Sequence, residues 1–88
     1  MQREHGRTGQ GGPFSVVLFH SISGALRAER LLMAEGLPLK CVPVPRHLSS
    51  DCGICVRIDR ADEVKAEAIL RRGNLEHQGV HPMEPEGP

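Results

Sequence analysis

The chain has 88 residues, with 11 basic and 11 acidic side chains, two Phe and no Tyr or Trp. That length supports a single domain with a modest core and excludes a deep cleft between two lobes. The balanced charge and the scarcity of aromatic residues argue against nucleic-acid binding, which needs a basic patch or stacking platforms. No apolar run approaches the ~20 residues of a membrane span and no signal peptide is evident, so we expect a cytoplasmic protein without a membrane partner.

The two ends of the sequence lack the periodicity of a folded element. Residues 1–12 are polar and Gly-rich, whereas residues 82–88 are rich in proline and acidic. Such compositions bury too little apolar surface to fold. We therefore expect one domain over residues 13–81 between a disordered lead-in and a disordered tail.

The first half of this domain predicts a strand followed by a helix. The apolar run Phe14–Phe19 suits a central strand. A polar break follows, in which Ser21 or Ser23 can cap a helix by accepting from its free N–H groups. Residues Ala25–Glu35 then have the apolar spacing of a helix, and Gly36 closes it.

The second half predicts two strands, a helix and a weaker strand. Residues Leu37–Val44 form a strand that should lie at a sheet edge, because its prolines lack ladder donors. A loop over residues 46–53 leads to alternating apolar positions in residues 54–58, the pattern of a half-buried strand. A helix then runs to about Arg72, and Leu75–His81 is the last strand.

This element order predicts a ferredoxin-like βαββαβ sandwich, an α+β fold in which two helices cover one face of a four-stranded antiparallel sheet. In that plan the first two strands run the same way. The loop that follows the first strand and the loop that joins the second and third strands then share one edge. We therefore expect Ser21 and Ser23 to face Cys52 there, together with the end of the second helix at Gly73 and Asn74.

The odd number of cysteines is a poor disulfide framework, and a reducing compartment would keep them as thiols. Cys52 sits in a polar loop with little packing to do, so we interpret it as an exposed working thiol. The nearby helix N-terminus, with Arg46 and Arg57, would favour its thiolate. The following Gly53 would let the backbone come close or adopt a positive φ. A cysteine that merely fills a turn is the alternative.

The other two cysteines have less specific interpretations. Cys55 completes a C-x-x-C with Cys52, which can bind a soft metal, form a redox disulfide or arise by chance. Strand alternation places Cys55 on the open face of the sheet, where a resolving thiol and a tolerated small residue are equally good interpretations. Cys41 lies inside a strand and suits a structural thiol. We expect no metal site.

The chain resembles the selenium/sulfur carrier-like family, a group of small bacterial and archaeal domains. The resemblance spans residues 14–81 and is carried by Val17–Ser21, Ala25–Leu32, Val42–Arg46, Ser49–Ile54 and Val56–Arg57. It implies a carrier, rather than a turnover enzyme, whose cysteine holds sulfur or selenium as a persulfide or selenosulfide. Carried over to this sequence, that cysteine is Cys52, followed by Gly53, and Cys55 is auxiliary. No cofactor is implied, and the donor would be a cysteine desulfurase or a selenocysteine lyase.

Two other functions compete with the carrier. A soft-metal carrier would use Cys52 and Cys55, although ferredoxin-like metallochaperones place their C-x-x-C after the first strand rather than before the third. A non-catalytic interaction module would use an open sheet face to form a homodimer or to dock on an enzyme. Function that survives removal of Cys52 would favour the module.

Overall fold

The computed structural model describes residues 14–48 and 52–83. The predicted order of elements is confirmed: β1 (Phe14–Leu18), α1 (Ile22–Ala34), β2 (Leu39–Pro43), β3 (Ile54–Asp59), a short 3-10 turn η1 (Arg60–Asp62), α2 (Glu63–Arg72) and β4 (Gly79–Pro82). The expected loose ends, residues 1–12 and 84–88, lie outside the described residues. The predicted tail begins too early, because Pro82 belongs to β4 and the Met83 N–H donates to the Phe14 carbonyl oxygen at 3.0 Å.

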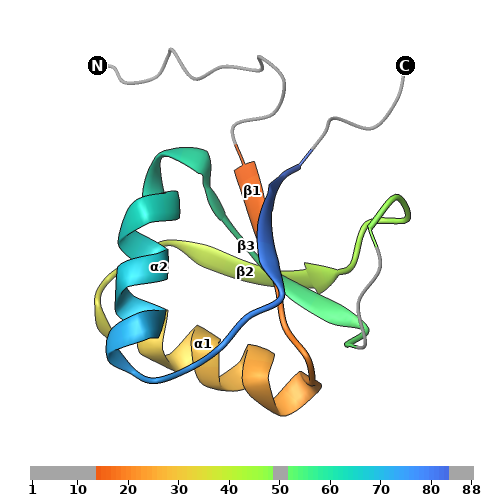
Figure 1. Ribbon diagram of the computed structural model, residues 1–88. Helices are drawn as coiled ribbons and strands as arrows, with labels where there is room; N and C mark the ends of the chain where they lie inside the picture. Colours follow the sequence, from red (N-terminus) through yellow and green to blue (C-terminus); the bar gives the residue numbers. More distant parts are fainter. Residues whose placement is uncertain (1–13, 49–51, 84–88) are drawn as a thin grey trace.

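The four strands form one sheet in the order β2-β3-β1-β4, and every neighbouring pair is antiparallel (Figure 1). β2 lies at an edge, as its prolines predict. Because β1 and β2 both pair with β3, they run in the same direction. Leu18 at the end of β1 is in register with Cys55 near the start of β3 and with Gly79 at the start of β4. The ends of β1 and β2 and the starts of β3 and β4 therefore lie along one edge of the sheet. This edge is formed by the strand ends and not by an outer strand.

Both helices pack on the same face of this sheet and build the main core (Figure 1). α1 contributes small alanines and one large side chain, so it can approach the strands closely. The buried members of this cluster that lie within strands and helices are Val17, Val56, Ile58, Ala25, Ala28, Leu32, Ala66, Ile69 and Leu70.

The other face of the sheet carries a second, smaller cluster. Val16, Leu18 and Cys55 are buried there, and Val42, Val44, Leu48 and Met83 pack against them. Val44 and Leu48 come from the first part of the loop between β2 and β3, so residues 44–48 lie against this face. The face is therefore partly covered, which corrects the expectation of an open surface.

Both helices end in the same capping arrangement. After α1, Gly36 adopts a left-handed φ of +79°, and the Leu37 N–H donates to the Leu32 carbonyl oxygen at 3.1 Å. After α2, Asn74 takes the left-handed position at φ 56°, and the Leu75 N–H donates to the Leu70 carbonyl oxygen at 2.9 Å. These are the hydrogen bonds of a Schellman motif, which glycine and asparagine favour.

The end of α2 lies beside the middle of α1 rather than at the edge where β1 and β2 end. The Arg27 guanidinium donates to the Gly73 carbonyl oxygen at 3.1 Å. A Cβ at Gly73 would stand 2.8 Å from the Leu31 side chain. The expectation that Gly73 and Asn74 join Ser21 and Cys52 is therefore wrong, because α2 ends beside α1 and the segment that follows it continues to the start of β4. Neither helix in the described residues is long and apolar enough to cross a membrane.

The core predicts a sharp contrast between two adjacent residues of α1. Leu32 is fully buried, whereas Met33 is 59% exposed. We expect Leu32→Ala to lower the free energy of unfolding by about 2–5 kcal/mol through lost burial and a residual cavity. Met33→Ala should change it by less than about 0.5 kcal/mol. Urea denaturation of both variants measures this, and equal losses would contradict the packing described.

Candidate functional site

Cys52 lies just before β3, at the edge where β1 and β2 end. It is only 3% exposed and belongs to the main core cluster, together with Phe19 and Ala25 from the two sides of the β1–α1 loop. The expectation of an exposed thiol is therefore wrong. A thiol packs well as a small apolar group, and the cluster under this edge accommodates it. Residues 49–51, which complete the family resemblance before Cys52, lie outside the described residues.

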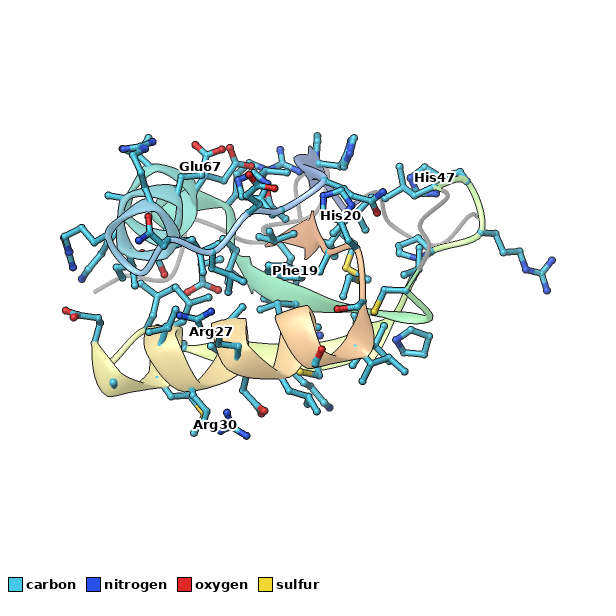
Figure 2. The ribbon with its side chains drawn as sticks, turned by 60° about the horizontal axis from the view of Figure 1, so that its bottom comes forward. Phe19, His20, Arg27, Arg30, His47 and Glu67 are labelled. Carbon is cyan, nitrogen blue, oxygen red and sulfur yellow. The ribbon has the colours of Figure 1, made fainter. Side chains whose placement is uncertain are left out.

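The loop between β2 and β3 continues the pairing of the two strands for one more step. The Val44 N–H donates to the Gly53 carbonyl oxygen at 3.3 Å, and the Leu48 N–H donates to the Pro45 carbonyl oxygen at 3.0 Å. Arg46 is exposed in the turn that the hydrogen bond between Leu48 and Pro45 closes. Figure 2 shows the neighbouring His47 at the outer end of the loop and His20 beside the end of β1. Arg46 as a stabiliser of charge on Cys52 stays a prediction.

Ser21 is the residue that caps α1. Its backbone is extended, and its Oγ accepts a hydrogen bond from the Gly24 N–H at 3.1 Å. Ser23 lies in the first turn, with its Oγ 3.3 Å from the Ser21 Oγ. This places the positive end of the α1 dipole at the same sheet edge as Cys52. The structure thus brings the β1–α1 loop and Cys52 to one edge, as the sequence predicts.

Neither of the two reasons expected for a glycine at position 53 applies in the structure. It is exposed, its φ is not in the left-handed region, and a Cβ at this position would meet nothing within 4 Å. Neither a close backbone approach nor a positive φ therefore requires glycine here. The feature that the structure does show is open space around residue 53.

Arg57 lies away from Cys52. Its guanidinium carbon is 4.2 Å from the centroid of the Phe14 ring, at the start of β1 and thus at the opposite end of that strand from Leu18. A cation over an aromatic face is a favourable contact, and it draws the side chain toward the far edge of the sheet. The expectation that Arg57 stabilises charge at the Cys52 thiol is therefore wrong.

Cys55 lies on the opposite face of the sheet from the cluster that holds Cys52. It is fully buried between Val16 and Leu18, and its Sγ donates to the Pro43 carbonyl oxygen at 3.8 Å. The face agrees with the alternation in the sequence, but the expected exposure does not. Burial raises the pKa of Cys55 to about 11, and the nearby Cys41 and Cys52 thiols add to the rise.

The two sulfurs of the C-x-x-C belong to clusters on opposite faces of the sheet. Successive side chains of a strand point to opposite faces, so Cys55 lies on the face opposite to its neighbour Val56 in β3. Cys52, which precedes β3, belongs to the core under the helices together with Val56, whereas Cys55 belongs to the cluster on the other side. In this conformation the motif is not arranged as a chelating pair or as a ready redox dithiol.

Cys41 is half-buried in β2, opposite Val56, and packs against the main core. Its pKa is raised chiefly by burial, then by the Glu29 carboxylate and the Cys52 thiol. A raised pKa keeps a thiol protonated near neutral pH and lowers its nucleophilicity. Within the described residues, no group of three or more His, Cys, Asp and Glu side chains could hold a metal ion.

One group of polar residues escapes the sequence analysis altogether. His77, which the sequence gives no reason to single out, packs edge-on against Phe19 with ring centroids 6.5 Å apart. Its Nε2 lies 3.9 Å from a carboxylate oxygen of Glu67 on α2. No spacing rule connects a helix residue to the irregular segment after it, so only the fold reveals this pair.

With this geometry in place, comparison with known proteins identifies the family. The chain matches the family described as "Putative Se/S carrier protein-like" over residues 15–82. It belongs to this family. The matched range contains both helices, all three cysteines and, apart from Phe14, the four described strands. No curated protein and no solved structure matches the chain.

The burial of Cys55 predicts an unusual pH profile for its reactivity. In a protein with Cys41 and Cys52 replaced by alanine, alkylation of Cys55 should rise with a midpoint above the value of 9.0 for an ordinary thiol, because burial, the largest cause of the raised pKa, remains. The midpoint should lie below about 11, because the two thiols that add to the rise are gone. The thiolate is the reacting species, and burial disfavours it. Iodoacetamide labelling followed by mass spectrometry measures the profile. The same protein in denaturant is the control, and a native midpoint near 9 would contradict the burial.

Proposed function

We propose that this protein carries a sulfur or selenium atom on Cys52, as a persulfide or selenosulfide, and passes it between protein partners. Family membership supports the kind of cargo. The observation that carries the choice of residue is the contrast among the three thiols. Cys41 and Cys55 lie inside strands with raised pKa values. Cys52 lies outside the strands, at the edge where the capped end of α1 is found.

Loading proceeds by thiol–disulfide exchange chemistry. The Cys52 thiolate attacks the outer sulfur of a persulfide on the donor's cysteine. A bond forms between Cys52 Sγ and that sulfur, the donor's S–S bond breaks, and its electron pair leaves with the donor's cysteine as a thiolate. The product on Cys52 is an anionic persulfide. The N-terminus of α1 and the Arg46 guanidinium supply the positive charge that favours it.

Because Cys52 is buried, the proposed carrier needs two conformations, one that exposes the thiol for exchange and one that covers the carried atom. With the thiol only 3% exposed, a donor cysteine reaches it when the segment around Gly53 moves outward. Gly53 is exposed and a Cβ at this position would meet nothing within 4 Å, so the contact to be broken is the hydrogen bond from the Val44 N–H to the Gly53 carbonyl oxygen. When the segment returns, the core excludes water and small thiols from the carried atom. A buried cargo site thus suits transfer between proteins better than release into solution.

The proposed setting follows from the same chemistry. A carrier needs its unloaded cysteine as a free thiol, and a reducing compartment keeps cysteines in that form, so we place the protein in the cytoplasm. The donor would be a protein of the cysteine desulfurase or selenocysteine lyase type. We assign the fold to the ferredoxin-like class, supported by the βαββαβ order with β1 and β3 at the centre of the sheet. The alternative of a soft-metal carrier loses support, because Cys52 and Cys55 lie on opposite faces.

Loading by a desulfurase-type donor tests the function. The wild-type protein is incubated with a cysteine desulfurase and cysteine, then measured by intact-mass spectrometry beside Cys52→Ser, Cys55→Ser and Cys41→Ser. We expect wild type, Cys55→Ser and Cys41→Ser to gain the mass of one sulfur and Cys52→Ser to gain nothing, because in this proposal Cys52 is the thiol that attacks the donor's persulfide. Each serine variant has its fold checked by circular dichroism.

Two outcomes would contradict this proposal in different ways. If Cys52→Ser loads as well as wild type, the carrier thiol is another residue. If loss of Cys52 and loss of Cys55 abolish loading equally, the two thiols act as a dithiol. Loading of Cys41→Ser at the wild-type level confirms that removal of a neighbouring thiol is not itself disruptive.

A further inference from the structure

A polar hollow lies between α2 and the segment that leads to β4. It has a volume of about 470 Å³ and is lined by Glu67, Arg71, Asn74, Leu75, Glu76 and His77. That volume is in the range of small-molecule sites. Figure 2 shows Glu67 on the side of α2 that faces away from α1. The hollow is therefore separate from the contacts between the two helices.

The lining combines both signs of charge at helical spacing. Glu67 and Arg71 are four residues apart on α2, so their side chains project from the same face of the helix. Within residues 14–48 and 52–83, Arg71 forms no ion pair, whereas the next residue, Arg72, reaches Glu35 at 3.6 Å. Among the described residues, the ion-pair partner that Glu67 approaches is the His77 Nε2, at 3.9 Å, which is longer than a hydrogen bond. A carboxylate and a guanidinium are thus both available to a third group.

The hollow is built on fixed backbone. The Leu75 N–H donates to the Leu70 carbonyl oxygen at 2.9 Å, and the Gln78 N–H donates to the Leu18 carbonyl oxygen at 2.7 Å, so the segment is tied at both ends. The ring of His77 packs edge-on against the buried Phe19. A preformed site loses little entropy when it binds a ligand.

One atom of this lining remains unsatisfied. The His77 Nδ1 is buried, and within the described residues it has no hydrogen-bond partner. A buried N–H without an acceptor is costly, so the favoured tautomer carries its proton on Nε2, the atom that points toward Glu67. The Nε2–H then faces the Glu67 carboxylate at 3.9 Å, too far for a hydrogen bond, so this carboxylate stays available to a ligand.

We propose that this hollow binds a small zwitterion of the α-amino acid class. Arg71 receives the carboxylate, with Asn74 as a neutral hydrogen-bond donor beside it. Glu67 and Glu76 receive the ammonium group. Leu75 offers a small apolar contact to the side chain of the bound amino acid. This site does not depend on Cys52 or on the proposed carrier function, so it can stand or fall alone.

Nuclear magnetic resonance titration of the ¹⁵N-labelled full chain tests the site with L-alanine as the probe. We expect saturable shifts of the Leu75, Glu76 and His77 amides, with a dissociation constant in the millimolar range for so small a ligand. Acetate and methylamine, which each carry one of the two charges, should bind at least about tenfold more weakly, because each satisfies half of the site.

Matched substitutions on α2 identify the charges that bind. Arg71→Gln and Glu67→Gln should each weaken L-alanine binding by about three- to tenfold, the size of one partly exposed charge contact. Arg72→Gln is the control, because Arg72 is adjacent in sequence but pairs with Glu35, the residue that caps the C-terminus of α1, and it should bind like wild type. Amide shifts far from the hollow report whether each variant keeps its fold.

Three results would overturn the proposal. L-alanine that causes no saturable shift shows that the hollow is not a site for this class. Acetate that binds as tightly as L-alanine shows a simple anion site. Binding that is unchanged in both Arg71→Gln and Glu67→Gln shows that the charges of α2 do not form the site.

Discussion

The antiparallel pairing of β3 with both β1 and β2 is the constraint on which the rest of the structure depends. It places the ends of β1 and β2 and the start of β3 at one edge, with Leu18 opposite Cys55 and Pro43 opposite Ile54. Without that register, the capped N-terminus of α1 and the segment that holds Cys52 would be far apart. The candidate site is therefore a product of sheet topology rather than of any local motif.

The same pairing separates the thiols. Side chains alternate across a sheet, so Cys55 lies in the cluster on the face opposite to the helices. Cys52 is a member of the cluster beneath the helices, and Cys41 packs against that cluster. Burial in a strand raises the pKa of Cys41 and of Cys55. A motif that looks like a dithiol in the sequence thus becomes one candidate carrier, Cys52, and one buried thiol on the opposite face, Cys55.

Local signals in the sequence were enough to predict the order of the elements, a cap at Ser21 or Ser23 and the helix end at Gly36, because these depend on neighbouring residues. The structure shows that the cap is Ser21. The burial of Cys52, the stacking of Arg57 on Phe14 and the hollow beside α2 depend on segments that are far apart in the sequence. An alternating pattern gives the face of a strand, but it does not show which loop will cover that face. For this reason the face of Cys55 was predicted correctly and its exposure was not.

The central claim is that Cys52 is the working thiol even though the core covers it at rest. Site-resolved alkylation of the native protein near neutral pH, read by peptide mapping, tests this claim most directly. The account predicts that Cys52 is labelled first, through movement of the segment around Gly53, then Cys41, and Cys55 last. Labelling of Cys41 first, with Cys52 protected until denaturant unfolds the whole domain, would contradict it.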